Sequence, residues 1–418
     1  MSSQRLSNIL GHLKGNTSGV SAVTSKNADD VVLTCAMRTP LTKAFKGGLK
    51  DTPVDILLMQ LMQHLLSRSK IDPSAVEDIC VGNVNEVGVP YKARAAALAA
   101  GFPNTTSVSS TNRFCSSGLV AIQNIANQIS CGSIDVGVAI GIEQMSLNVD
   151  KQGPGFSAAI TGANQDAADC SMTMGQTSEN VGSDFDIPRE RQDRYAAASF
   201  QRAEAAQKSG LFAEEIVPIT TTWKDPKTGE EKQVTVSADD GIRYGTTYEG
   251  LSKIRPAFTQ WGDRSTGGNS SQVTDGAAAV LLMKRSVAEK LGQPILAKFC
   301  GATVAGLPPR IMGIGPSIVV PKLLNKFGLT VDDIDIFELN EAFASMAVYC
   351  VDKLKLDVEK VNPRGGAIAL GHPLGATGCR QVVTGLAEMR RQKKKLFVNT
   401  MCIGTGMGMA GLWVNEVL

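Results

Sequence analysis

Two cysteines and one histidine stand in sequence surroundings that could support chemistry. Cys115 precedes a Ser-Ser-Gly run, His372 lies in a Gly-His-Pro sequence, and Cys402 opens an alternating run of glycines that ends at Gly408. Glycine is used where the backbone must bend sharply or approach a ligand closely. A rigidly held imidazole with a thiol nearby in the fold suits general acid–base work near neutral pH. The pattern favours a catalytic site, and two glycine-rich turns around a buried His and Cys are the alternative.

Cys115 stands where a predicted short strand over 107–110 leads into a predicted helix that continues to about residue 130. The partial positive charge at a helix N-terminus stabilises a thiolate, and a nearby imidazolium would lower the thiol pKa further. Most protein cysteines are inert core residues. The small residues that follow Cys115 allow a ligand to approach closely, which favours the catalytic interpretation.

Composition excludes several classes of protein. At 418 residues the chain is long enough for two or three domains, or for one large core with an insertion. Its net charge of +2 gives no argument for binding nucleic acid or an anionic membrane. Nine cysteines form an odd set without a C-x-x-C pair, so we expect free thiols in a reducing compartment and no metal site. No apolar run approaches the roughly 20 residues that span a bilayer, and no secretory signal is expected.

Residues 1–30 differ from the rest of the chain. Leucine and isoleucine side chains first follow a helical spacing, and the sequence then turns polar and rich in Gly, Ser and Thr, as a linker does. The pairs Arg5-Leu6 and His12-Leu13, separated by five residues, resemble the type 2 peroxisomal targeting signal, which a receptor reads. We therefore predict a targeting segment and linker over 1–30, and location in the peroxisome matrix. A short amphipathic helix docked on the body is the alternative.

From residue 31 onward, strands alternate with helices, which predicts an α/β fold with a mainly parallel sheet covered on both faces. Residues 147–250 break this rhythm and are predicted to form an inserted loop domain, the place for a large cosubstrate, with a helix over 189–208 and a charged hairpin over 224–233. The predicted halves are 31–146 closed by 251–285, and 286–418. In each half a buried strand delivers a polar residue to a helix start, Cys115 in one and Asn340 in the other.

Motifs in four parts of the chain resemble those of the thiolase family. They are Asn-x-x-Cys-x-Ser-Gly at 112–118, Asn-Glu-Ala-Phe at 340–343, Gly-His-Pro at 371–373 and Cys-x-Gly-x-Gly-x-Gly at 402–408. The resemblance runs from Val31 to Val417 and, with the segment over 1–30, points to fungal-type peroxisomal members. It implies a five-layered α/β/α/β/α fold of two similar halves with an inserted loop domain. It also implies a homodimer, coenzyme A (CoA) as cosubstrate, and no permanently bound cofactor or metal.

The resemblance assigns a role to each motif. His372 takes the proton of Cys115, whose thiolate attacks a 3-ketoacyl-CoA, and Cys402 exchanges protons with the departing acetyl-CoA and the incoming CoA. Such covalent catalysis splits one difficult cleavage into two easier steps. The backbone N–H of Cys115 with that of Gly404 or Gly406 would form one oxyanion hole. A second would use His372 and a water held by Asn340.

Two further residues match family positions near CoA. Arg243 matches the position beside the nucleotide, and Ser271 matches the position that touches the pantetheine arm; a charged residue such as Arg243 could equally belong to a solvated face. The chain departs from the family pattern at Thr405, which interrupts three glycines, and at Gly267 and Ser270, where alanines are usual. These departures concern substrate fit and not the reaction.

Three functions remain open from the sequence. The first is thiolytic cleavage of 3-ketoacyl-CoA as the last step of peroxisomal fatty acid β-oxidation. The second is condensation of two acetyl-CoA molecules by a related biosynthetic enzyme, and the targeting signal favours the first over it. The third is a non-enzymatic acyl-CoA-binding relative, which an incomplete catalytic set would have indicated. A ketoacyl synthase would pair its cysteine with two histidines, and the chain has only three histidines, two of them in its first 64 residues.

Overall fold

The computed structural model describes residues 19–148 and 155–417. The residues of the predicted targeting signal, Arg5, Leu6, His12 and Leu13, lie outside this described part, so that signal stays a prediction. A short helix α2 (Val20–Thr24) precedes the first strand and buries Val23 against the second half of the body. None of the helices in the described residues is long and apolar enough to cross a membrane.

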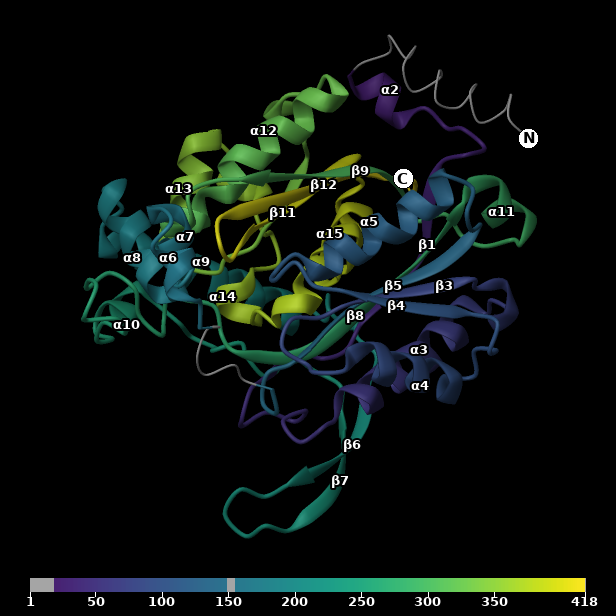
Figure 1. The fold of residues 1–418 in the computed structure, drawn as a ribbon, viewed down its shortest axis with the longest axis horizontal. Helices are drawn as coiled ribbons and strands as arrows, with labels where there is room; N and C mark the ends of the chain where they lie inside the picture. Colours follow the sequence, from purple (N-terminus) through teal and green to yellow (C-terminus); the bar gives the residue numbers. More distant parts are fainter. Residues whose placement is uncertain (1–18, 149–154, 418) are drawn as a thin grey trace.

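The body is built in five layers, which Figure 1 shows as two groups of strands separated and flanked by helices. Apolar clusters on both faces of each strand group hold the layers together. The outer layers are α3 (Val54–Ser69) with α4 (Val89–Ala100), and α12 (Gly315–Phe327) with α13 (Ala344–Leu354). Between the strand groups lie α5 (Ser117–Ser130) and α15 (Thr377–Gln392), whose sides are buried against both.

The strands of the two halves join in one sheet of order β10-β11-β12-β9-β1-β8-β5-β3-β4, with β2 beside β8. Only the pairs β3–β4, β3–β5 and β10–β11 are parallel among the described strands, so the prediction of a mainly parallel sheet was wrong. Strand β12 returns from β11 by a tight turn, and β8 returns from β5 after the long segment 145–273; each pairs antiparallel with both of its neighbours in this order. The bounds are β1 Val31–Arg38, β2 Thr42–Lys43, β3 Asp78–Gly82, β4 Ser107–Thr111, β5 Val136–Gln144, β8 Thr274–Lys284, β9 Ala297–Gly306, β10 Ile336–Leu339, β11 Leu396–Ile403 and β12 Met407–Asn415.

The two halves repeat the same order of elements. The first runs β1-α3-β3-α4-α5-β5-β8 and the second β9-α12-β10-α13-α15-β11-β12, with β4 added in the first. The parallel pairing of β3 with β5 ends at Gly82 and Gly141, and that of β10 with β11 ends at Leu339 and Thr400. Asn83 and Asn340 each directly follow the last paired residue, so they are counterparts in the two halves. The counterpart of the Cys115 turn is therefore the turn before α15. The sequence-based pairing of Cys115 with Asn340 was wrong, because the two residues precede helices from different layers.

Glycines let the two central helices touch backbone to backbone. A side chain at Gly118 of α5 would place its Cβ 2.7 Å from the Gly375 carbonyl oxygen, and one at Gly378 of α15 would lie 2.4 Å from the Leu119 nitrogen. Real Cβ atoms do not make such contacts, so larger residues would force the helices apart. The starts of α5 and α15, each preceded by a candidate catalytic residue, are thereby fixed side by side.

The segment between β5 and β8 holds more helices than the sequence predicted. The helix over Arg189–Lys208 is α9, and the hairpin is formed by β6 (Ile219–Lys224) and β7 (Glu231–Val236), which project from the body in Figure 1. Three of the four further helices described in this segment are short: α6 Ala158–Thr161, α7 Gln165–Asp169 and α10 Tyr248–Ser252, whereas α8 runs over Met174–Asp184; the short helix α11 (Arg285–Lys290) follows β8. The domain boundaries given above stay a prediction.

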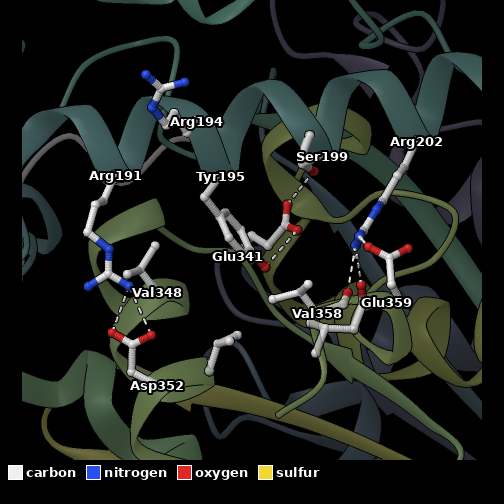
Figure 2. Close-up of a pocket in the computed structure, with 13 residues that line it drawn as sticks. Arg191, Arg194, Tyr195, Ser199, Arg202, Glu341, Val348, Asp352, Val358 and Glu359 are labelled. Atoms are coloured by element: carbon white, nitrogen blue, oxygen red, sulfur yellow. Dashed lines mark hydrogen bonds and ion pairs between the residues drawn. The ribbon is translucent and has the colours of Figure 1, made fainter. Parts of the chain in front are cut away.

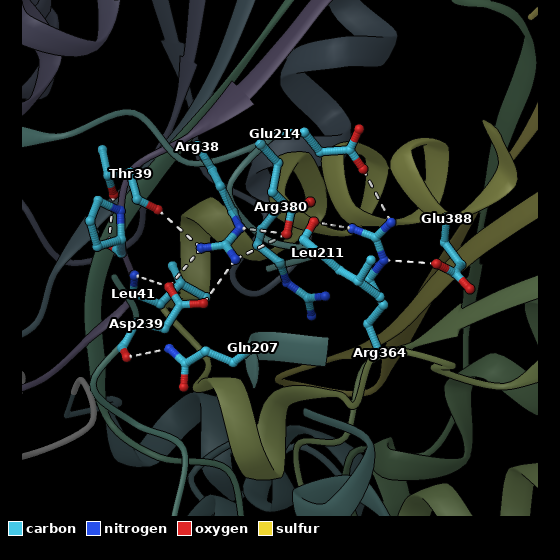
Figure 3. Close-up of polar contacts among 12 residues, drawn as sticks. Arg38, Thr39, Leu41, Gln207, Leu211, Glu214, Asp239, Arg364, Arg380 and Glu388 are labelled. Atoms are coloured by element: carbon cyan, nitrogen blue, oxygen red, sulfur yellow. Dashed lines mark hydrogen bonds and ion pairs between the residues drawn. The ribbon is translucent and has the colours of Figure 1, made fainter. Parts of the chain in front are cut away.

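Buried arginines tie this segment to the body (Figure 3). Arg38, fully buried at the end of β1, donates hydrogen bonds of 2.7 and 2.8 Å to Asp239 and of 3.0 and 3.2 Å to Glu215. Arg364 likewise contacts Glu388 at 2.8 Å and the Leu211 carbonyl at 2.7 Å. Because a buried charge needs a partner, each arginine fixes the loop that supplies its acceptors.

We predict that Arg38→Ala destabilises the fold by about 3–5 kcal/mol, because it leaves two buried carboxylates without their partner. Arg191→Ala is the matched control, since the Arg191–Asp352 pair is about half exposed on both sides and should contribute at most about 1 kcal/mol. Urea denaturation followed by tryptophan fluorescence measures both. Equal stability losses for the two variants would contradict the prediction.

Candidate functional site

Cys115 lies at the tip of a tight turn that leads into α5. Phe114 has a positive φ of 47°, an unusual conformation for a bulky residue. Hydrogen bonds within the turn hold it: the Ser117 hydroxyl donates to the Phe114 carbonyl at 2.6 Å and accepts from the Arg113 N–H at 2.9 Å. The Ser-Ser-Gly run thus fixes the direction of the Cys115 side chain, as well as allowing close approach.

Burial governs the chemistry of the Cys115 thiol. It raises the pKa of Cys115 to about 11, against the lowering effect of a hydrogen bond from the Gly404 backbone N–H, while the negative charge of Glu143 raises it further. The sequence-based expectation was a thiol pKa lowered by the helix terminus and an imidazolium. That expectation was wrong for the resting site, because desolvation penalises the thiolate more than the helix start stabilises it.

His372 is buried at the start of the turn that precedes α15. Its Nδ1 lies 2.7 Å from the Thr377 hydroxyl and its Nε2 lies 3.4 Å from Asn340 Nδ2. Its backbone N–H donates to the Gln272 carbonyl at 3.0 Å. Burial, with a contribution from the Arg380 charge, lowers the pKa of His372 to about 3. The imidazole is therefore neutral near pH 7 and has a nitrogen free to accept a proton.

Asn340 follows strand β10 and is only 2% exposed. Its backbone N–H donates to the Thr400 carbonyl at 2.9 Å, which places it beside β11. Among the described residues its side-chain oxygen has no hydrogen-bond donor. A buried acceptor of this kind costs free energy unless a water or ligand group satisfies it. Asn340 thus presents an open acceptor next to His372.

Cys402 lies near the end of β11, and the turn after it joins β11 to β12. Burial raises the pKa of Cys402 well above its usual range, and the neighbouring Cys115 raises it further. In the turn, Thr405 has φ 66° and Gly406 has φ 86°. The backbone N–H of Gly404 reaches Cys115, so the two thiols and this turn share one region. The sequence motifs at 115, 340, 372 and 402 are brought together.

Arg243 and Ser271 both belong to the surroundings of the segment 267–271, which contacts the loop after Asn340. The Arg243 guanidinium donates to the Gly267 carbonyl at 3.0 Å and stacks over the Phe200 ring at 5.4 Å. The backbone N–H of Ser271 donates to the Ala342 carbonyl at 3.0 Å. Both side chains are half-buried, so each keeps a surface that a ligand could contact. Burial lowers the pKa of Arg243.

Sequence reasoning missed three residues that support the site. Thr377 contacts His372 directly, Gln272 holds the His372 backbone, and Glu143 at the end of β5 holds the turn that follows His372. Thr377 lies four residues after the Gly-His-Pro motif, so a hydroxyl five residues after His372 was a local signal that could have been used. Glu143 lies in β5, far from His372 in the sequence, and Gln272 directly follows Ser271, which was singled out only for CoA.

A cavity of about 380 Å³ lies between α9 and α13 with Glu341 in its wall (Figure 2), and Cys115 is not among the residues that line it. Its walls combine valines with Tyr195 and Glu341, and three arginines stand at its rim. Arg191 pairs with Asp352 and Arg202 with Glu359, while Arg194 pairs with Glu190, so each of the three arginines already has a carboxylate partner. Within the described residues, no group of three or more His, Cys, Asp or Glu is arranged to hold a metal ion.

We predict that Gly406→Ala destabilises the protein by about 1–3 kcal/mol, because an L-residue is strained at its positive φ. Its Cβ would also lie 2.2 Å from the Leu307 carbonyl oxygen. Gly404→Ala is the control from the same turn, since its Cβ would meet nothing closer than 3.9 Å and should leave thermal stability nearly unchanged. A thermal melt of both variants measures the difference. Equal melting temperatures would contradict the prediction.

We also predict that iodoacetamide alkylates Cys115 about tenfold faster for each pH unit between pH 7 and pH 10, because only the thiolate reacts. The reason is that its pKa is raised to about 11, so the rate should not level off within this range. Peptide mass spectrometry follows the modification, and free cysteine in the same buffers shows the ordinary profile. A plateau of the Cys115 rate near pH 8.5 would contradict the prediction.

Comparison with known proteins agrees with this arrangement. Residues 31–286 match the family described as "Thiolase, N-terminal domain", and residues 293–415 match "Thiolase, C-terminal domain". The chain is 50% identical over 417 residues to the peroxisomal 3-ketoacyl-CoA thiolase of Yarrowia lipolytica, covering 99% of this chain and 100% of that one.

Solved structures give the same result. The dimeric peroxisomal thiolase of Saccharomyces cerevisiae superimposes with a TM-score of 0.88 at 45% identity, covering 95% of this chain and 100% of that one. Human mitochondrial 3-ketoacyl-CoA thiolase in complex with CoA gives a TM-score of 0.81 at 34% identity, covering 93% and 98%. The five layers, the four converging motifs and these similarities together lead to one conclusion: the chain belongs to the thiolase family.

Proposed function

We propose that this protein cleaves 3-ketoacyl-CoA with CoA, giving acetyl-CoA and an acyl-CoA shortened by two carbons, in the peroxisome matrix as the last step of fatty acid β-oxidation. The observation that carries the proposal is that Cys115, His372, Asn340 and Cys402 meet in one place, where Cys115 is half-buried and the other three are at most 5% exposed. The near full-length similarity to a relative named for this activity and this organelle supports both the reaction and the location.

The first step forms an acyl-enzyme. His372 accepts the Cys115 proton while the sulfur attacks the 3-keto carbon, and the C2–C3 bond then breaks to leave the acyl group on Cys115. Burial disfavours the charged form of both residues, so the resting pair stays neutral and proton transfer accompanies attack. This arrangement keeps a reactive thiolate from standing exposed before substrate is bound.

The second thiol handles the protons of the other product and of the incoming cosubstrate. Cys402 protonates the acetyl-CoA carbanion, and the resulting thiolate then takes the proton of CoA. The CoA sulfur attacks the acyl-Cys115 thioester, and Cys115 leaves with a proton returned by His372. Proximity of the two sulfurs, which raises the pKa of Cys402, supports this division of work.

Backbone and amide groups would stabilise the developing negative charges. The N–H groups of Cys115 and of Gly404 or Gly406 are the donors for the oxyanion of the acyl group, and the Gly404 N–H already points at the Cys115 sulfur. Asn340, with its open acceptor, would hold a water that works with His372 on the acetyl-CoA enolate. Preorganised donors of this kind cost no reorganisation during the reaction.

CoA and a second copy of the chain are the proposed partners, together with the receptor for the type 2 targeting signal. Arg243 would contact the CoA nucleotide and Ser271 the pantetheine arm. Strand β4 ends the sheet, with only β3 beside it among the described strands, and Tyr91 nearby is 85% exposed. Pairing of two β4 edges would cover this surface in a homodimer. A monomeric mass in sedimentation equilibrium would contradict the dimer.

Cleavage of acetoacetyl-CoA and of 3-ketohexadecanoyl-CoA by purified protein, with and without CoA, tests the proposed function. We expect CoA-dependent cleavage of the long substrate and its loss, by more than about a thousandfold, in Cys115→Ala. Mass spectrometry should find the acyl group on Cys115 when CoA is withheld. Cleavage of acetoacetyl-CoA alone would favour the biosynthetic reaction, and cleavage of neither would leave a binding protein.

A further inference from the structure

Two buried carboxylates hold the segment that carries His372, one before the histidine and one after it. Before the histidine, the Ile368 N–H donates to Glu341 Oε2 at 3.1 Å, and after it the Gly375 N–H donates to Glu143 Oε2 at 3.0 Å. Glu143 belongs to the first half of the fold and Glu341 to the second. Both side chains are at most 1% exposed.

We propose that Glu143 and Glu341 are positioning residues, which act together to fix the His372 imidazole against Cys115 from opposite ends of the segment 368–375. The inference rests on the proposed function, because it assigns these residues to the same reaction. Neither carboxylate touches Cys115 or His372 by a hydrogen bond, so each acts through the backbone that it holds.

Glu143 uses its full capacity to accept hydrogen bonds. Oε1 accepts from Asn83 Nδ2 at 3.2 Å and from the Asn85 N–H at 3.0 Å, and Oε2 accepts from the Val84 N–H at 3.0 Å and from Gly375. The carboxylate therefore ties the loop after β3, the end of β5 and the turn after His372 into one unit. Four donors and no acceptor around it favour the ionised form, whereas burial raises its pKa to about 7.

Glu341 is saturated in the same manner on the other side (Figure 2). Oε1 accepts from the Tyr195 hydroxyl at 3.2 Å and from Asn362 Nδ2 at 2.8 Å, and Oε2 accepts from the Ser199 hydroxyl at 2.7 Å and from Ile368. Two of these donors lie on α9. Because Glu341 directly follows Asn340, its carboxylate joins the inserted helix and the His372 segment to the loop that carries Asn340. This saturation also leaves Glu341 no free acceptor toward the cavity beside it.

The repeat of the two halves places Glu143 at a meaningful position. The register that makes Asn83 the counterpart of Asn340 makes Glu143 the counterpart of Cys402. Their cross-strand partners agree, since Glu143 lies opposite Gly276 and Cys402 opposite Gly408. The equivalent strand end thus carries the proposed proton-transfer residue Cys402 in the second half. In the first half it carries Glu143, whose carboxylate holds a turn of the second half.

Glutamine at these positions would place a donor where donors already converge. In Glu143→Gln, whichever way the amide is oriented, its NH2 group faces two N–H donors that the surrounding structure keeps in place. In Glu341→Gln either orientation opposes one fixed N–H group, because the Tyr195 and Ser199 hydroxyls can rotate to accept. The first variant should therefore disturb the His372 segment more than the second.

A matched control is available in the same protein. Glu179 is also 1% exposed, and its two oxygens accept from the Ser265 N–H at 2.6 Å and the Arg264 N–H at 3.3 Å. Glu179→Gln opposes one fixed N–H in either orientation, as Glu341→Gln does, but it holds the loop at 264–265 and not the His372 segment. Loss of stability alone should affect this variant and Glu341→Gln similarly.

The test measures kcat and KM for cleavage of 3-ketohexadecanoyl-CoA, with kcat expressed per Cys115 thiol that iodoacetamide titrates. Misplacing a catalytic group by about 1 Å can cost about a hundredfold, so we expect kcat to fall about 10- to 100-fold in Glu143→Gln and less in Glu341→Gln. KM should stay within about twofold, because the segment positions the base and not the CoA. Glu179→Gln should keep its kcat per titrated site.

The pH profile of Cys115 alkylation separates charge from position. The facing titratable groups are Glu143, Cys402 and the neutral His372, and the Glu143 charge raises the pKa of Cys115. Glu143→Gln should therefore shift the profile to lower pH. Glu143→Asp keeps the charge but is too short to reach all four donors, so its profile should match the wild type while its kcat falls. This variant also serves if Glu143→Gln does not fold.

Two results would overturn the inference. One is a kcat per titrated site in Glu143→Asp and Glu341→Gln that falls no further than in Glu179→Gln. The other is a KM in Glu143→Asp that rises well beyond twofold, which would place the defect in substrate binding and not in the position of His372. Wild-type protein that cleaves neither substrate would instead contradict the proposed function, and the alkylation profiles would still decide whether Glu143 acts on Cys115.

Discussion

The site depends on the backbone contact between the two central helices. Gly118 of α5 and Gly378 of α15 leave no room for a Cβ, and the resulting contact fixes the starts of both helices side by side. Each helix is preceded by a turn that carries a reactive residue, Cys115 in one half and His372 in the other. Larger residues at these positions would push the two helices, and with them the two turns, apart; because the helices come from different halves of the chain, no local sequence feature could bring the turns together.

Burial is the second constraint, and it explains the unusual protonation states. Low local polarity raises the thiol pKa of Cys115 to about 11 and lowers the imidazole pKa of His372 to about 3. Both shifts keep the resting residues neutral. A neutral thiol and imidazole do not attract cations, and a thiol oxidises less readily than a thiolate. Charge then develops during the reaction, next to the preorganised backbone donors.

The duplicated fold explains why support and chemistry come from both halves. By register, Asn83 corresponds to Asn340 and Glu143 to Cys402. Asn340 and Cys402 lie at the candidate site, whereas Glu143 accepts from the Gly375 N–H in the turn after His372 and Asn83 donates to Glu143. Each half thereby supplies structure for the other, so that neither could keep the site in order alone.

The sequence by itself determined the family, favoured thiolytic cleavage and singled out the residues at 115, 340, 372 and 402 as candidates, because glycine-flanked motifs are local patterns that sequence spacing preserves. It also predicted most strands and helices, including α9 at its observed bounds. The sequence-based prediction of strand direction was wrong, because a buried strand shows the same apolar run whether it pairs parallel or antiparallel with its neighbours. Only the tertiary structure decided how Glu143, Gln272 and Glu341 support His372, and the direction of the Cys115 pKa shift. Both depend on which groups meet after folding, since desolvation and long-range hydrogen bonds have no counterpart in local sequence.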